Sequence, residues 1–134
     1  MPILRLGMGV FLAYWGADKI VATEGSVGIF SRFYRVETGP SLVQLLGVAE
    51  ILLGLALAAG LLRVPLAWIQ LVVNGVSTLA SWKQLIDPWG VFGLTRGGAH
   101  LFLASIVITA ASIVLVINAR DDTLTLDRAL RRRR

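Results

Sequence analysis

Four long stretches of the chain are almost entirely apolar, and three segments richer in polar residues and glycine separate them. The stretches run from Ile3 to Ala17, from Leu42 to Leu62, from Val64 to Ser81 and from Leu101 to Ala119. A helix of roughly 20 mostly apolar residues crosses a bilayer core about 30 Å thick, and each stretch reaches or approaches that length. The pattern therefore predicts an all-α integral membrane protein, a bundle of four transmembrane helices. The helices are expected at about residues 3–20, 42–62, 64–82 and 100–119.

The composition agrees with one membrane domain spanning residues 1–134. Of the 134 residues, 56% are apolar and 16% are charged, and the mean hydropathy is +0.76. Four spans and their connections use the whole chain, which leaves no room for a soluble catalytic domain. The absence of cysteine excludes disulfides and cysteine-held metal clusters. The apolar run after Arg5 is followed by no small-x-small cleavage site, so a retained first helix is expected rather than a signal peptide.

The basic residues indicate an orientation in the membrane. With four spans both termini share one side, and eight of the thirteen Lys and Arg residues fall there. Because cytoplasmic segments are enriched in Lys and Arg, we expect cytoplasmic termini. The basic tail at 120–134 ends in the run Arg131 to Arg134, which is expected to contact anionic lipid headgroups. No basic domain accompanies the tail, so nucleic acid is not an expected partner.

The three connections differ in length and character. The connection between the second and third expected helices is very short and consists of little more than Arg63. Such a short connection predicts a tight antiparallel hairpin. The segment from Val21 to Ser41 carries Phe30 and Phe33 at a spacing that places them on one side of a short helix, expected at the outer membrane interface. The segment from Trp82 to Ala99 is rich in glycine and is expected to bend or partly re-enter the membrane.

Aromatic residues are concentrated at the end opposite the termini, with Trp68 and Phe11 as the exceptions. An ordinary aromatic belt would populate both interfaces. The one-sided distribution favours one of two interpretations. Either these residues form a surface for a protein partner or a lipid-soluble ligand, or they are a plain outer anchor. The residues expected on this surface are Tyr14, Trp15, Trp82, Trp89 and Phe92.

Glu50 lies near the centre of the second apolar stretch, where an ionisable side chain is costly and normally faces a partner. At a rise of about 1.5 Å per residue, Glu50 and Asn74 fall at similar depth on neighbouring helices. A hydrogen bond between them is therefore expected, with Gln70 extending the polar stripe. Such contacts can simply lock helix packing. Alternatively, because no cation is expected at this depth, a protonated Glu50 could donate a hydrogen bond or pass a proton.

The first stretch has a basic residue near each end and small residues between them. Arg5 marks the inner end, and Asp18 and Lys19 mark the outer end. At the outer end these two are expected to cluster with His100 and Lys83, where the histidine is either a solvated residue at a helix start or a titrating group. Small residues on the first two helices predict their close approach. They are Gly9, Ala13 and Ala17 on the first helix and Gly47, Gly54 and Ala58 on the second.

Three segments resemble the DoxX-like family of small bacterial membrane proteins: Arg5 to Lys19 (RLGMGVFLAYWGADK), Leu46 to Gly54 (LGVAEILLG) and Leu124 to Leu130 (LTLDRAL). The shared features are an arginine opening the first helix, a glycine and a lysine three residues apart closing it, a glutamate among glycines, and a leucine–aspartate ending. The matching residues are Arg5, Gly16, Lys19, Glu50, Gly54 and Asp127. His100 departs from the family pattern, because the resemblance implies a less basic residue at the start of the fourth helix.

The resemblance implies a membrane subunit of a redox or oxidative-stress complex. Relatives include a subunit of thiosulfate:quinone oxidoreductase and a membrane partner in an oxidative-stress complex, and the MauE proteins of amine dehydrogenase maturation are similar. Such a subunit would bind a protein partner, and quinone is a candidate ligand of Glu50, Lys19 or His100.

Other functions stay open on the sequence alone. One alternative is a structural or assembly protein, in which Glu50 and Asn74 only set the helix register, and another is a small-solute or proton transporter. A second copy of the chain is an alternative partner. No nucleophile with a base, metal site or nucleotide loop can be assembled, so catalysis by this chain alone is not expected.

Overall fold

The structure, a computed structural model, describes residues 1–122 and 125–126. Within these residues it contains helices and no strand, so the expected all-α class is confirmed. Asp127 and the run Arg131 to Arg134 lie outside the described residues. In chain order the elements are α1 (Pro2–Val21), α2 (Thr23–Ile29), the π-helical segment η1 (Phe30–Tyr34), α3 (Pro40–Ala59), α4 (Arg63–Ala80), α5 (Trp82–Ile86), the 3₁₀ segment η2 (His100–Leu103) and α6 (Ala104–Ile117).

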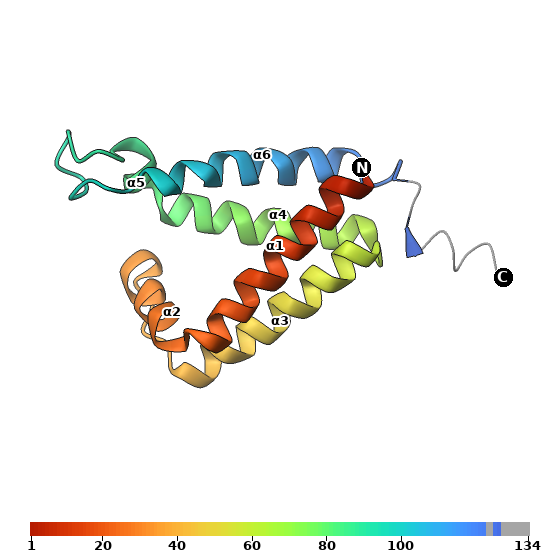
Figure 1. Cartoon of the computed structure of the whole chain (residues 1–134), viewed down its shortest axis with the longest axis horizontal. Coiled ribbons are helices and arrows are strands. Elements are labelled where there is room, and N and C mark those ends of the chain that lie inside the picture. Colours follow the sequence, from red (N-terminus) through yellow and green to blue (C-terminus); the bar gives the residue numbers. More distant parts are fainter. Residues whose placement is uncertain (123–124, 127–134) are drawn as a thin grey trace.

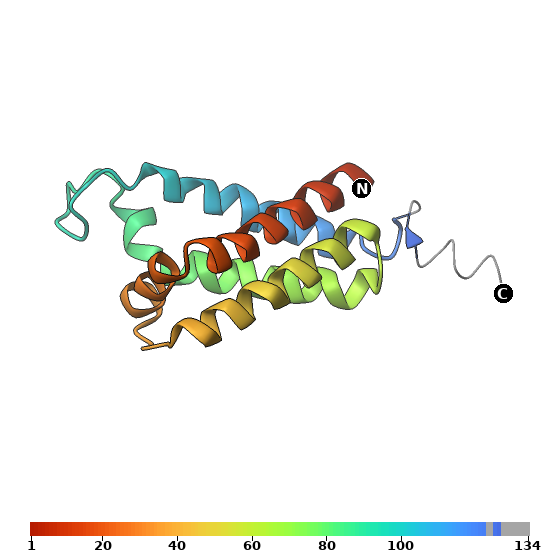
Figure 2. The ribbon, with the colours of Figure 1, turned by 60° about the horizontal axis from the view of Figure 1, so that its bottom comes forward.

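The long helices form two antiparallel pairs, α1 with α3 and α4 with α6 (Figures 1 and 2). The pairs cross each other, and smaller contacts join α1 to α6 and α3 to α4. The prediction that the second and third helices pack tightly against each other as an antiparallel hairpin is therefore wrong. Although α3 and α4 are joined by a short turn, each packs mainly on a helix distant in sequence.

Glycines on facing surfaces explain why α3 pairs with α1. A Cβ atom added at Gly9 would lie 2.5 Å from the carbonyl oxygen of Gly54, and one added at Gly16 would lie 2.5 Å from that of Gly47. These distances leave no room for a side chain, so the two backbones are in direct contact. The close approach expected from the small residues is confirmed at these two points.

The turn between α3 and α4 begins earlier than the hydropathy indicates. Gly60 adopts a left-handed conformation, with a φ of 75°, and its N–H donates to the carbonyl oxygen of Leu57 at 3.0 Å. This arrangement ends an α-helix, and glycine adopts it without steric cost. The second helix was expected to reach residue 62 because Leu61 and Leu62 continue the apolar run.

The apolar surface of the long helices faces outward. Two helical segments are long and apolar enough to cross a membrane: Pro40–Ala59, with a mean hydropathy of 2.2, and His100–Ile117, with 2.5. Only 22% and 11% of these segments is buried inside the protein, whereas a core helix of a soluble protein would be mostly buried. Exposed Leu52 and Val107 illustrate the pattern. An apolar surface of this extent is favourable in contact with lipid.

The first outer segment is helical, as expected, but it packs on the protein. The Phe33 ring lies 5.5 Å from the Phe102 ring, and the Tyr34 hydroxyl lies 2.9 Å from the Ser77 Oγ. Through these contacts η1 binds both α4 and η2. The segment therefore connects the α1/α3 pair to the α4/α6 pair at the end opposite the termini (Figure 1).

Candidate functional site

Lys19 and Glu50 form an ion pair between α1 and α3. The Lys19 Nζ lies 2.7 Å from the Glu50 Oε2, and the side chains are 9% and 16% exposed. Lys19 follows Gly16, and Glu50 follows Gly47, by three residues in each case. The glycine contact thus brings the backbones together one helical turn from the pair, which lets the long lysine side chain reach the carboxylate.

This ion pair corrects the expectation for Glu50. The carboxylate binds Lys19 and not Asn74, and a cation does lie beside it. The depth argument placed Glu50 and Asn74 at one level but could not show how each helix is rotated about its axis. Asn74 faces α6 instead.

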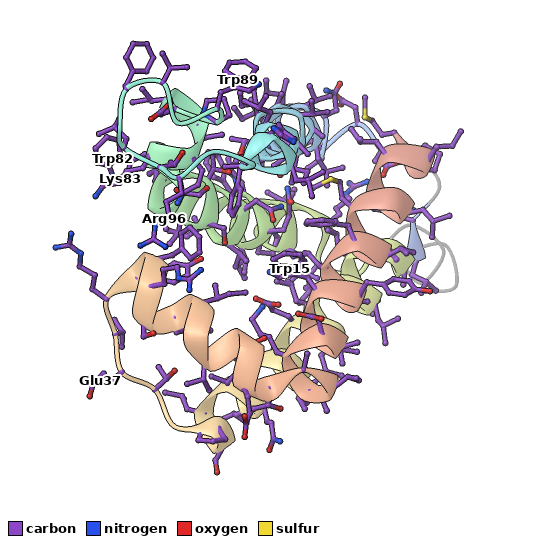
Figure 3. The ribbon with its side chains drawn as sticks, turned by 60° about the vertical axis from the view of Figure 1, so that its left-hand side comes forward. Trp15, Glu37, Trp82, Lys83, Trp89 and Arg96 are labelled. Carbon is purple, nitrogen blue, oxygen red and sulfur yellow. The ribbon has the colours of Figure 1, made fainter. Side chains whose placement is uncertain are left out.

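Trp15 lies against the same lysine. The Lys19 Nζ is 5.7 Å from the centre of the Trp15 ring, a cation–π distance, and the Trp15 ring stacks on Phe11 at 6.0 Å. Trp15 is 48% exposed, so one part of the ring is open to the surroundings. In Figure 3 it projects from α1 toward the middle of the view. The result is a buried ion pair bordered by an accessible aromatic surface.

Gln70 and Asn74 belong to a separate polar cluster with Ser112 of α6. The Asn74 Nδ2 donates to the Gln70 Oε1 at 3.0 Å and to the Ser112 Oγ at 3.1 Å, and the Ser112 Oγ donates to the Gln70 Oε1 at 3.0 Å. Gln70 and Ser112 are completely buried. The polar stripe expected on α4 therefore exists, but it joins α4 to α6. Its groups bind one another, which is typical of interhelical packing contacts.

An ion pair between Arg5 and Asp122 joins the start of α1 to the segment after α6. The Arg5 Nε also donates to the Ala58 carbonyl oxygen at 3.3 Å, and the Arg63 side chain donates to the Asp122 carbonyl oxygen at 2.6 Å. Arg5 was expected at this end, whereas Asp122 was missed. Two consecutive acidic residues at the end of the last apolar stretch, on the side of Arg5 and Arg63, were the available signal.

The expected outer cluster does not form. Over residues 1–122, no hydrogen bond or ion pair joins Asp18 or His100 to Lys19, whose ammonium binds Glu50. His100 is exposed at the start of η2, and Asp18 is exposed on α1. The Lys83 Nζ lies 5.7 Å from the Trp82 ring instead.

The aromatic residues expected on one surface fall into two groups. Tyr14 and Trp15 are on α1, whereas the exposed side chains of Trp82, Trp89 and Phe92 belong to α5 and the loop after it. In Figure 3, Trp89 lies across the α4/α6 pair from Trp15, and Trp82 lies beside the end of that pair. The structure therefore separates these two tryptophans from the Lys19 site.

Asp87 organises the loop that carries Trp89 and Phe92. Its Oδ2 accepts a hydrogen bond from the Leu94 N–H at 2.9 Å, and its carbonyl oxygen accepts one from the Thr95 hydroxyl at 2.6 Å. Burial raises the pKa of the Asp87 carboxyl, but hydrogen bonds from loop N–H groups, led by those of Phe92 and Leu94, outweigh burial and lower the pKa below its ordinary value. The sequence offered no indication of this role.

We expect the stabilising effect of Asp87 to disappear in acid. Because the folded-state pKa is below the unfolded one, the unfolded state binds the proton more readily. The contribution is therefore complete above the ordinary aspartate pKa of about 3.9 and is lost as the pH falls through the lower folded value. Asp87→Asn should lower the melting temperature at about pH 7, and the difference from wild type should shrink toward about pH 3.

Glu37→Gln provides the control, because Glu37 is an exposed carboxylate in the other outer loop (Figure 3). It should leave the melting temperature nearly unchanged across the same pH range. A difference between Asp87→Asn and wild type that stayed constant down to about pH 3 would contradict the role of the ionised carboxylate.

Comparison with known proteins identifies the family to which these residues belong. Neither the curated proteins nor the solved structures gave a match. The DoxX family model matches residues 1–82, a range that includes α1, α3, α4 and the Lys19–Glu50 pair. Together with the two apolar helical segments, this match indicates a membrane protein. Because the match covers more than half of the sequence, the chain belongs to the DoxX family.

Proposed function

We propose that the chain is a multi-pass subunit of the bacterial inner membrane that supports a redox or oxidative-stress complex by binding a protein partner and a quinone. In this proposal α1, α3, α4 and the η2/α6 segment all cross the bilayer as a four-helix bundle, and the termini are cytoplasmic.

Internal pairing of polar groups supports four crossings. Two of the helices, α1 and α4, are less apolar because they carry Arg5, Lys19, Gln70 and Asn74. Polar side chains are tolerated inside a membrane when they face the protein and have partners. Lys19 binds Glu50, Arg5 binds Asp122, and the two amides bind Ser112.

The observation that carries the quinone assignment is the Lys19–Glu50 pair next to the accessible ring of Trp15. A quinone is a flat, apolar molecule with carbonyl oxygens, so its site requires an apolar or aromatic wall and a few hydrogen-bond donors. Trp15 offers the wall, and the Lys19 ammonium offers the donor. Glu50 holds the ammonium in place and is a proton acceptor close to it.

In this proposal the quinone supplies the redox chemistry and the partner supplies or takes the electrons. Lys19 would orient a carbonyl oxygen of the quinone by donating a hydrogen bond. Glu50 would hold the lysine side chain in place through the ion pair, and its carboxylate would be available to accept a proton. The exposed Trp89 and Phe92, held on the loop that Asp87 organises, are assigned to the protein partner.

A structural or assembly function is the second candidate, and one observation favours it. The ion pair lies next to the backbone contact between Gly16 and Gly47. In this second candidate function, the sole role of the ion pair is to hold α1 on α3 in one register. The outer loop would then recognise an enzyme, and no quinone would bind.

Quinone extracted from protein purified gently from native membranes tests the proposal. Lys19→Gln and Trp15→Leu should each lower the quinone per mole of chain by about fivefold or more, because each removes one of the few groups that orient the ligand. Lys83→Gln is a matched control, since its ammonium lies at the same 5.7 Å from a tryptophan ring. Its quinone content should equal that of wild type.

Quinone content, the melting temperature and mass spectrometry, measured on the same samples, together separate the candidate functions. The melting temperature identifies variants that fail to fold, and Trp15→Leu leaves the ion pair in place if Lys19→Gln does not fold. Mass spectrometry identifies the proteins that co-purify. A partner enzyme without quinone in wild type would contradict the quinone site and support assembly, whereas equal quinone in all variants would place its binding elsewhere.

A further inference from the structure

A groove lies between α4 and α6 at the end where α4 begins and α6 ends. Its volume is about 420 Å³, within the range of small-molecule sites. Within residues 1–122 and 125–126, Arg120 is the one charged residue that lines it. The other walls are apolar and come from Val64, Trp68, Leu71, Ile113, Val116 and Ile117.

The groove opens to the outside of the protein. Trp68 and Ile117, from its two opposite helices, are 54% and 71% exposed. Trp68 is also an exception to the concentration of aromatic residues at the other end of the molecule. Tryptophan in a membrane protein is enriched at the level of the lipid headgroups. We therefore place Trp68, which lines the groove with Arg120, at the level of the lipid headgroups.

The charge at the mouth of the groove favours an anion. Arg120 is exposed, and among the residues that the structure describes no carboxylate lines the groove. The neighbouring Asp122 is bound to Arg5, and Asp121 does not line the groove. Farther along the sequence, Arg128 and the run from Arg131 to Arg134 add positive charge to the same end of the chain.

We propose that the groove binds one anionic phospholipid. An acyl chain lies along Trp68 and Ile117, and the phosphate binds the Arg120 guanidinium, whose planar donors suit phosphate oxygens. This site goes beyond the proposed function and does not involve Lys19 or Glu50. It rests on the proposed crossing of the bilayer by α4 and the η2/α6 segment, and the proposed orientation is needed only to assign the lipid to the cytoplasmic leaflet.

Quenching of Trp68 fluorescence by brominated lipid tests the proposal. The full chain with Trp15, Trp82 and Trp89 replaced by phenylalanine keeps one tryptophan, next to the groove. It is reconstituted in phosphatidylcholine vesicles in which either phosphatidylglycerol or part of the phosphatidylcholine carries brominated acyl chains. Because both leaflets have the same composition, the result does not depend on orientation.

Brominated phosphatidylglycerol should reach half-maximal quenching at a mole fraction about fivefold lower than brominated phosphatidylcholine, the effect expected of one basic residue near the surface. Arg120→Gln should remove this difference. The matched control, Arg96→Gln, replaces an exposed arginine of the outer loop (Figure 3) and should keep the difference. Native mass spectrometry of the four-tryptophan chain, with and without Arg120→Gln, gives the same comparison if the single-tryptophan form does not fold.

Two results would overturn the proposal. Equal quenching by both lipids would show that the groove takes any phospholipid. A preference for phosphatidylglycerol that survives Arg120→Gln would assign the selectivity to other charges, such as those of residues 128–134. Either result leaves the quinone proposal untouched, because neither depends on Lys19 or Trp15.

Discussion

Gly54→Ala is expected to destabilise the protein by about 1–3 kcal/mol, the usual cost of overpacking a tight interface. The added Cβ would lie 2.4 Å from the Gly9 carbonyl oxygen and 2.7 Å from the Ala13 backbone nitrogen. Both atoms belong to the α1 backbone, which cannot move aside as a flexible side chain would. Thermal unfolding in detergent, followed by circular dichroism, measures the effect.

Gly75→Ala is the matched control, since Gly75 is also inside a long helix but has nothing within 4 Å of an added Cβ. There alanine should stabilise the helix by about 0.5–1 kcal/mol, because glycine loses more backbone entropy on folding. If Gly54→Ala were as stable as Gly75→Ala, the backbones of α1 and α3 could not be in contact as the structure shows.

Lys19→Met is expected to cost about 3 kcal/mol, the lower end of the range for removing one member of a buried ion pair, because Lys19 is buried and Glu50 is only partly buried. The loss follows because Glu50 would keep its charge without a partner, or would have to take up a proton. Glu50→Met should have a comparable effect. The double variant should be less destabilised than either single one, since it leaves no unpaired charge and methionine fills the space.

A double-mutant cycle on the free energy of unfolding tests this coupling. Reversible unfolding in mixed detergent micelles provides the four free energies. Additive effects of the two substitutions would show that Lys19 and Glu50 do not interact. Recovery of stability in the double variant without recovery of quinone would show that the pair has a function beyond packing.

These two predictions concern the same helix pair, because the ion pair lies one turn from the second glycine contact, that of Gly16 with Gly47. Gly16→Ala should therefore have two effects. Its Cβ would meet the Gly47 carbonyl oxygen at 2.5 Å and the Ile51 backbone nitrogen at 2.8 Å, so α1 must move away from α3. That movement also pulls Lys19 from Glu50. The proposed quinone site should be lost with the helix contact.

Hydropathy located the four long helices, and the small residues on the first two indicated their close approach. These properties are local: apolar runs reflect the cost of exposing backbone and polar groups to lipid, and glycine reduces side-chain volume wherever it occurs. The membrane character and the family can likewise be recognised from the sequence, since the Gly16, Lys19, Glu50 and Gly54 pattern needs no coordinates.

The partners of the polar groups were beyond the sequence. Depth along the helix suggested Glu50 with Asn74, and a shared position near one end of the bundle suggested Lys19 with His100. Both suggestions were wrong. Which groups meet depends on which helices pair and how each is rotated about its axis. An error of half a turn moves a side chain to the opposite face.

What the sequence by itself determined is the kind of molecule: helical, apolar outside, with ionisable groups at a few places on the first two long helices. What only the tertiary structure decided is their pairing: Lys19 with Glu50, Arg5 with Asp122, the amides of α4 with Ser112, and Asp87 with its own loop. The physical reason is that burial of apolar surface depends on composition along the chain. Hydrogen bonds and ion pairs instead require two groups within about 3 Å, and only the packed helices set that distance.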